Sequence, residues 1–202
     1  MKKLLLVPIL ALLAFTISEP KSLEKKERKF AKDFLKDTKS DVVKTVRGLS
    51  DAQLKYKIAP DRWSVEECAK HIAAAEMGLR QMLDGSLKQP ATPEKRSEIK
   101  VTDEQLIKMI EDRSRKAQAP EQLKPENTPF KSADEALSSF KENREKLIDF
   151  VKNTQEDLRN HVVELPFGKI DAYQLVLMIS AHSNRHTQQM KEVIADANFP
   201  KQ

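Results

Sequence analysis

The most informative stretch of this sequence is DAYQLVLMISAHSNRHTQQM, residues 171–190. Leu175 and Ile179 recur at a spacing that places large apolar side chains on one side of an α-helix. His182 and His186 are four residues apart, so they lie about 40° apart around the helix axis and point toward that same side. The stretch therefore predicts an amphipathic helix whose buried face carries two imidazole rings.

Four helix starts can be recognised from a recurring capping box. In this motif an oxygen-bearing side chain caps the helix, and a Glu or Gln three residues later reaches back to the cap. The motif begins at Ser64, Thr102, Ser132 and Asp171. A further helix is predicted over residues 23–49, where apolar side chains fall on one face. The residues of that face are Phe30, Phe34, Val42, Val46 and Leu49.

The connections between these helices are also predictable. Gly48 ends the first helix, a short helical turn follows over residues 51–56, and three prolines make residues 120–129 a rigid connection. Residues 161–170 are able to form a local hairpin, and the helix beginning at Thr102 is short. Each long helix has one apolar face, and a bundle buries all four faces at once. We predict an all-α, four-helix bundle with one short inserted helix, as a single domain over residues 23–198.

The first residues have the pattern of an export signal. Lys2 and Lys3 precede the apolar run of residues 4–15, which is too short for an ordinary membrane-spanning helix. We expect a signal peptide over residues 1–18, with cleavage near Ser18 and Glu19, and an uncleaved membrane anchor is the alternative. The mature protein would then be periplasmic or extracellular.

Composition narrows the classes of function. The net charge is +5, but acidic and basic residues are interleaved, and no basic stripe with aromatic residues is present. Nucleic-acid binding is therefore not expected. Cys68 is the one cysteine, so the chain cannot form an internal disulfide. It falls on an apolar helix face and is predicted to be a small buried side chain.

A third candidate metal ligand, His71, stands in WSVEECAKHIAAAEMGLRQML, residues 63–83. It lies at the margin of an apolar helix face, so it is either a half-exposed boundary residue or a side chain that meets His182 and His186. Two buried imidazoles need separate hydrogen-bond partners, whereas one divalent ion satisfies both rings. Three histidines with an open position are typical of a catalytic metal site. His161 has a polar loop context and is predicted to lie on the surface.

Glu76 lies four residues after Ile72 and three before Leu79, so it is predicted to point inward. A buried carboxylate is rare unless it is paired. Glu76 is therefore expected to orient a ligand histidine, to act as a base on water, or to form a salt bridge. Arg185 and Gln189 flank the histidine pair, and they either line a pocket or belong to a solvated face.

Two segments together resemble a known family. Residues 49–76 read LSDAQLKYKIAPDRWSVEECAKHIAAAE, and residues 167–190 contain the block H-x-x-R-H-x-x-Q. The block stands here as His182, Arg185, His186 and Gln189. This combination resembles the DinB-like (DinB/YfiT) superfamily of metal-dependent enzymes. The resemblance implies a four-helix bundle, frequent homodimers, and a divalent ion held by His71, His182 and His186.

The resemblance also bears on the reaction. Members of that superfamily with known chemistry are mostly thiol-dependent transferases or isomerases with cytosolic thiol cofactors, and an exported chain departs from that setting. Our leading hypothesis is an exported metal-dependent hydrolase or group transferase that acts on a small molecule. Zn, Ni, Mn and Fe all accept imidazole, so the metal is not specified. The alternatives are a bundle that binds a metal or a small ligand without turnover, and a purely structural bundle.

Overall fold

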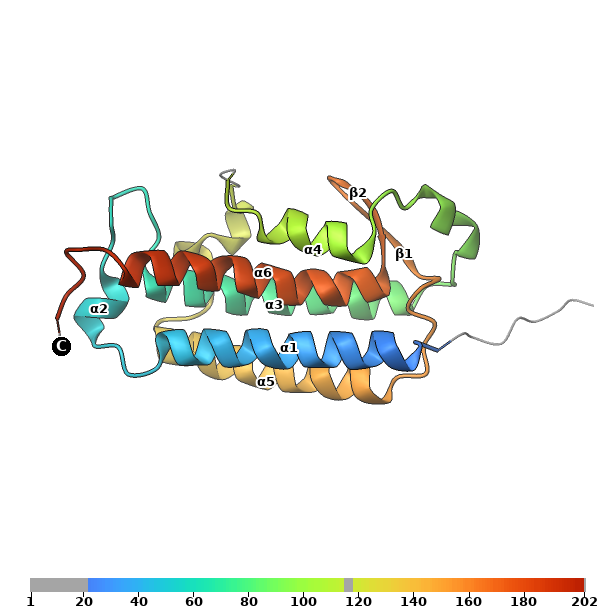
Figure 1. Ribbon diagram of the computed structural model, residues 1–202, viewed down its shortest axis with the longest axis horizontal. Helices are drawn as coiled ribbons and strands as arrows, with labels where there is room; N and C mark the ends of the chain where they lie inside the picture. The colour runs from blue at the N-terminus through green and yellow to red at the C-terminus, as the bar shows by residue number, and fades with distance from the viewer. Residues whose placement is uncertain (1–21, 115–117, 202) are drawn as a thin grey trace, which may run out of the picture.

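Four long helices lie side by side in the computed structural model, which describes residues 22–114 and 118–201 (Figure 1). They are α1 (Lys25–Val46), α3 (Val65–Leu87), α5 (Ala133–Asn153) and α6 (Ala172–Ile194). This confirms the predicted helical bundle. The predicted signal peptide, residues 1–18, lies outside the described residues. Within the part of the chain that the structure describes, no helix combines the length and the apolar character needed to cross a bilayer.

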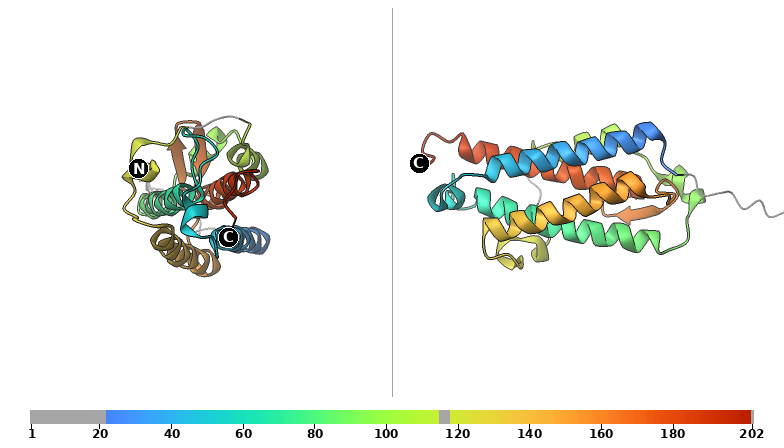
Figure 2. Two further views of the ribbon diagram at one scale, coloured as in Figure 1. Left: turned by 90° about the vertical axis from the view of Figure 1, so that its left-hand side faces the viewer. Right: turned by 90° about the horizontal axis from the view of Figure 1, so that it is seen from below.

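The order of the helices around the bundle is α1, α6, α3 and α5. α1 and α6 run in one direction, whereas α3 and α5 run in the other (Figures 1 and 2). Because α3 and α5 are parallel neighbours, the chain must travel back along the bundle between them. The return path contains α4 (Asp103–Glu111), which packs on α6 and is the predicted short inserted helix.

Short elements complete the connections. They are α2 (Asp51–Lys55) and three 3-10 helices, η1 (Pro93–Glu98), η2 (Glu121–Leu123) and η3 (Pro125–Asn127). The two strands are β1 (Val162–Leu165) and β2 (Gly168–Asp171), paired antiparallel with Val162 opposite Asp171. The hairpin expected over residues 161–170 is therefore present, and it leads directly into α6.

Local side-chain hydrogen bonds set the starts of the helices. Reciprocal capping boxes form at Ser64, Thr102 and Asp171, as predicted. At Ser132 only half of the motif forms, because the Glu135 carboxylate accepts from the backbone N–H of Lys131 instead. Each cap satisfies N–H groups that the first helical turn leaves without partners.

Two details of the predicted helices are wrong. The first helix ends at Val46, three residues before the predicted end, and Gly48 follows with a positive φ of 80°. Phe30 was placed on the buried face, but it is 49% exposed. Its neighbour Ala31 is buried instead, and adjacent positions differ by about 100° around a helix.

His161 is also placed differently from its prediction. It was expected on the surface, yet only 8% of it is exposed. Its Nδ1 lies 3.0 Å from the carbonyl oxygen of Ser86 at the end of α3. The chain entering the hairpin passes over this end of the bundle, and a polar loop sequence does not reveal that contact.

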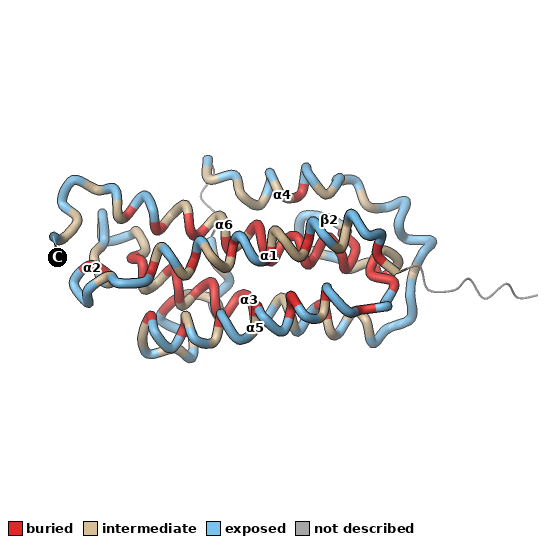
Figure 3. Tube along the Cα trace, turned by 60° about the horizontal axis from the view of Figure 1, so that its bottom comes forward, coloured by how far each residue is buried: buried red, intermediate tan, exposed pale blue. Residues whose placement is uncertain are grey.

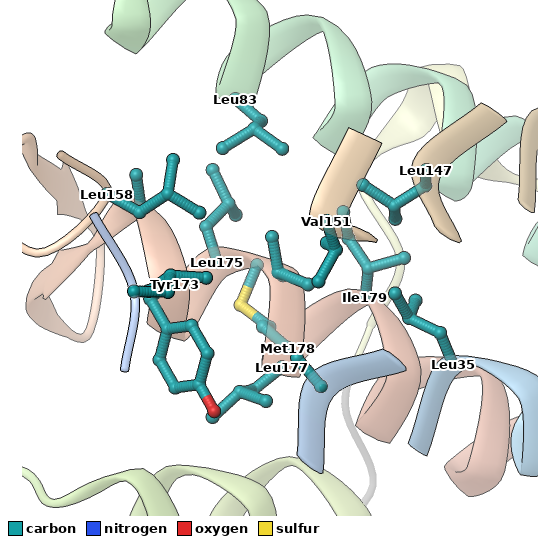
Figure 4. Close-up of a cluster of buried hydrophobic side chains, with 14 of the residues drawn as sticks. Leu35, Leu83, Leu147, Val151, Leu158, Tyr173, Leu175, Leu177, Met178 and Ile179 are labelled. Atoms are coloured by element: carbon teal, nitrogen blue, oxygen red, sulfur yellow. The ribbon is translucent and has the colours of Figure 1, made fainter. Parts of the chain in front are cut away.

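The apolar core consists of two clusters along the bundle. The first cluster lies toward the start of α6 and includes Leu35, Leu83, Leu147, Leu175 and Ile179 (Figure 4). The second lies toward the other end and includes Val46, Cys68, Ile72, Phe140 and Met190. The buried segments of the long helices face one another (Figure 3). Cys68 is buried as predicted, and burial raises the pKa of its thiol.

A buried polar layer lies between the two clusters, with one side chain from each long helix. The Arg144 guanidinium donates to both oxygens of Glu76, at 2.7 and 2.6 Å. It also donates to the Thr38 hydroxyl, the Leu35 carbonyl and the Ser183 hydroxyl. All five N–H donors of a guanidinium are thereby satisfied. Arg144 is fully buried, and periodicity alone did not reveal its role.

A second arginine joins the helix starts at one end of the bundle. The Arg159 guanidinium contacts Glu27 of α1, Asp103 of α4 and Asp171 of α6 at 2.6 to 3.0 Å. It also lies over the Tyr173 ring, 4.1 Å from the centroid. Negative side chains near a helix start are favourable, and Arg159 holds three of them together.

Replacing Arg144 tests the importance of the polar layer. We expect Arg144→Met to lower the free energy of unfolding by about 3–5 kcal/mol, because Glu76 would be left buried and unpaired. The double variant Arg144→Met, Glu76→Met should recover most of this loss. Lys146→Met, which breaks an exposed ion pair with Glu142 on the same helix, is the control and should change stability by less than about 1 kcal/mol. Equal effects of Arg144→Met and Lys146→Met in urea denaturation would contradict this account.

Candidate metal centre

Three imidazole rings from two helices meet inside the bundle. Each of His71, His182 and His186 offers a ring nitrogen, and these nitrogens all lie within 4.8 Å of one another. The Nε2 atoms of His71 and His182 are 3.2 Å apart. Two nitrogens bound to one tetrahedral Zn²⁺ at about 2.05 Å are separated by about 3.3 Å. The spacing therefore suits ligands of a single divalent ion.

Helix packing produces this convergence. The four-residue spacing places His182 and His186 on one face of α6, and α3 packs against that face. His71 on α3 is 3% exposed, so the half-exposed alternative for this residue is wrong. The ring centroids of the three histidines are 4.5 to 5.0 Å apart. The three candidate ligands predicted from the sequence are thus brought together.

Hydrogen bonds at the outer ring nitrogens determine the tautomers of two histidines. The Nδ1 of His71 lies 2.7 Å from the Leu123 carbonyl oxygen. The Nδ1 of His186 lies 3.1 Å from the Oε1 of Gln189. Because both partners are acceptors, each Nδ1 carries the proton, and each Nε2 keeps a lone pair for a metal.

An aromatic ring covers the histidines on one side. Trp63, just before α3, lies 4.8 Å from the His71 ring and 5.8 Å from the His186 ring, between centroids. The indole is nearly parallel to the His186 ring, with 25° between the planes. Trp63 therefore packs directly against two of the three imidazoles. This contact depends on the packing of α3 and α6, so local sequence patterns do not reveal it.

Electrostatics favour neutral imidazoles at this centre. Burial lowers the pKa of His71, and burial together with the other two histidines lowers the pKa of His186 well below its ordinary value. His182 is partly exposed, yet burial and the charge of His71 lower its pKa to about 3. Metal ions bind the neutral imidazole. Protons therefore compete weakly for these three rings near neutral pH.

Glu76 is buried, as predicted, and forms the salt-bridge alternative. Both of its oxygens accept from Arg144, as described above. Its described hydrogen bonds lead to Arg144 and not to a histidine. The described contacts therefore support neither the base role nor the histidine-orienting role for Glu76.

The two predicted flanking residues have different contacts. The Gln189 side chain contacts His186, so it belongs to the centre. The Arg185 guanidinium instead donates to the carbonyl oxygens of Ile110 and Asp112, where α4 ends. Such contacts satisfy carbonyls that a helix end leaves without partners. Arg185 thereby attaches α4 to α6 beside the histidines.

Two described surface cavities lie elsewhere. One, of about 640 Å³, lies beside Arg159, and the other, of about 560 Å³, lies between α1 and α5 with Lys36 and Lys141 in its wall. None of the three histidines lines either cavity. The histidine centre is therefore separate from both of these cavities.

Known proteins share this architecture. A family model for the DinB superfamily matches residues 35–190. The uncharacterised protein YuaE of Bacillus subtilis (strain 168) is 28% identical over 149 residues, which cover 73% of this chain and 87% of YuaE. YfiT from Bacillus subtilis has a TM-score of 0.58 at 15% identity, over 86% of this chain and 89% of YfiT. YfiT is described as a probable metal-dependent hydrolase with an unusual four-helix bundle topology.

The fold and the site together define a helical bundle with a three-histidine centre between facing helices. Because the family model spans most of the described residues, the chain belongs to the DinB superfamily. The family assignment made from residues 49–76 and 167–190 is confirmed. The domain bounds of 23–198 stay a prediction, since the matched region is shorter at both ends.

The lowered histidine pKa values predict a pH dependence of stability in the metal-free protein. An unfolded histidine titrates near pH 6.5, whereas folded His182 titrates near 3. Between these values the unfolded chain binds a proton that the folded protein does not, so stability falls as the pH drops below 6.5. The slope from His182 is at most about 1.4 kcal/mol per pH unit.

Urea denaturation from pH 7.5 to 5 measures this slope above the range in which most carboxylates titrate. We expect His182→Asn to show a shallower decline than the wild-type protein, because the substituted side chain takes up no proton. Identical declines in the two proteins would show that His182 stays as easily protonated in the folded state as in the unfolded chain.

Proposed function

We propose that this protein is a divalent-metal-dependent hydrolase that holds its ion with His71, His182 and His186. The observation that carries the proposal is the convergence of three ring nitrogens within 4.8 Å, from two helices, in the bundle interior. Three protein ligands leave a tetrahedral ion with one position for water or substrate, as in catalytic zinc sites.

The surroundings of the histidines support a metal site over an ordinary polar core. The Leu123 carbonyl and the Gln189 amide oxygen keep protons on the Nδ1 atoms of His71 and His186, which directs both Nε2 lone pairs inward. Trp63 packs against the His71 and His186 rings and adds to the apolar surroundings of the centre. When bound, a divalent ion at this position would supply Lewis-acid polarisation of a substrate oxygen.

Similarity to known proteins adds support for hydrolysis. The description of YfiT as a probable metal-dependent hydrolase concerns a protein of the same fold. This chain has the same fold and brings three histidines of its own together, and the extension to its own reaction is our inference. Group transfer, export to the periplasm or the exterior, and a homodimer stay predictions. The substrate and the metal, among Zn, Ni, Mn and Fe, are not specified by the described contacts.

A metal-free structural bundle is the rival function, and one distance favours it. The 3.2 Å separation of the His71 and His182 Nε2 atoms also suits a direct hydrogen bond, with one nitrogen donating and the other accepting. In that case the three rings would form a polar core network without an ion. Metal binding separates the two proposals.

Metal content distinguishes them directly. We expect purified protein to bind about one divalent ion per chain and the variant His182→Ala, His186→Ala to bind none, because two of its three ligands are lost. His161→Ala is the matched control, since His161 is a buried histidine that contacts Ser86 and not the centre. It should retain wild-type metal content, measured by elemental analysis and Zn²⁺ titration.

Thermal unfolding provides a second measurement. Bound metal stabilises the native state, so removal with a chelator should lower the Tm of the wild-type protein and of His161→Ala. The double-alanine variant should not respond to the chelator. Equal metal content in all three proteins, or a wild-type Tm that no chelator changes, would favour the structural bundle.

A further inference from the structure

Arg113 connects the surface of the bundle to His186. It follows α4, and its Nε and Nη2 donate to the two oxygens of Glu192 at 2.9 and 2.8 Å. Its third nitrogen, Nη1, donates to the Oε1 of Gln189 at 3.2 Å. That same oxygen lies 3.1 Å from the Nδ1 of His186. The Arg113 side chain is 18% exposed and its contact with Gln189 is partly buried, whereas its ion pair with Glu192 is exposed.

We propose that Arg113 is a positioning residue that, through Gln189, fixes His186 in the tautomer able to bind a metal. The metal part of this inference rests on the proposed function, but the tautomer part stands on the contacts alone. Arg113 itself does not contact the three Nε2 atoms in any described hydrogen bond, so its action is indirect.

Arg113 can select the orientation of Gln189 because the two ends of an amide group differ chemically. The Gln189 amide can present either its oxygen, which accepts, or its NH₂, which donates. Presenting the NH₂ to His186 would require a bare Nδ1 and a proton on Nε2, which blocks metal binding. A guanidinium only donates, so Arg113 accepts no bond from the NH₂ and selects the oxygen. The oxygen in turn requires the proton on Nδ1.

Glu192 holds Arg113 in place and offsets its charge. A cation beside a metal site repels the ion, but the Glu192 carboxylate binds Arg113 through two hydrogen bonds and offsets its charge. Arg62 also contacts Glu192, at 3.3 Å, without contacting Gln189. The positive charge of Arg185 contributes to the lowered pKa of His186.

The connection between α4 and α5 therefore serves two of the three histidines. Leu123 of this connection accepts from His71 through its backbone carbonyl, which no substitution removes. Arg113 of the same connection acts through a side chain, so its contribution can be deleted. A substitution of Arg113 can therefore test how the tautomer of His186 is set.

The first measurement uses the metal-free protein. Nitrogen-15 NMR of the imidazoles reports which ring nitrogen of His186 carries the proton. We expect the Nδ1–H form in the wild-type protein and a mixture of tautomers in Arg113→Met. Arg113→Lys, which keeps a donor-only group, should restore much of the Nδ1–H form. Arg62→Met is the matched control because it removes an arginine from the same carboxylate, and it should leave the tautomer unchanged.

The second measurement is the affinity for Co²⁺, followed through its visible absorption. Loss of a partner that orients a ligand typically weakens metal binding by about 10- to 100-fold. We expect about a 10-fold loss in Arg113→Met and none in Arg62→Met. In a Gln189→Leu background, Arg113→Met should cause no further loss, because its route to His186 is already absent.

The outcomes separate the two proposals. An unchanged His186 tautomer in Arg113→Met overturns the positioning role, as does an equal loss of Co²⁺ affinity with and without Gln189. A wild-type protein that binds no Co²⁺ contradicts the metal-dependent function, and the tautomer measurement still decides the role of Arg113. Circular dichroism of each variant confirms that the bundle is folded.

Discussion

The buried guanidinium of Arg144 is the interaction on which the rest of the structure depends. A charge in an apolar interior is costly unless it is paired and every donor has a partner. Here the partners come from α1, α3 and α6, and Arg144 belongs to α5. A shift of any one helix by a turn would remove a partner from this layer. The layer therefore specifies the axial register of the four long helices, whereas the two apolar clusters above and below it tolerate more variation.

The same register determines the geometry of the histidine centre. Glu76 follows His71 by five residues on α3, and Ser183 directly follows His182 on α6. Because both polar side chains meet Arg144, α3 and α6 are held in the axial register in which the rings of His71 and His182 meet. The buried polar residues around Arg144 are costly for stability, but they determine where the candidate ligands lie. Their role is specificity of arrangement, which a core of similar apolar side chains would not impose.

The centre also depends on a part of the chain outside the four long helices. α4 is needed because α3 and α5 run in the same direction, and the returning chain then supplies the Leu123 carbonyl and the Arg113 side chain. These groups orient imidazoles that α3 and α6 bring together. The topology of the bundle therefore provides both the helices that carry the three histidines and the connection that reaches two of them.

The amino-acid sequence by itself determined the helices, most of their starts, and the common face of His182 and His186. Capping boxes and apolar periodicity are local, so they are legible without knowledge of the fold. The sequence also made His71 a candidate with two alternatives, and resemblance to a family favoured the ligand role. The partners of Glu76, the burial of His161 and the contacts of Trp63 and Arg113 were decided only by the tertiary structure. Periodicity states which way a side chain points from its own helix, but the group that it meets depends on how distant segments pack.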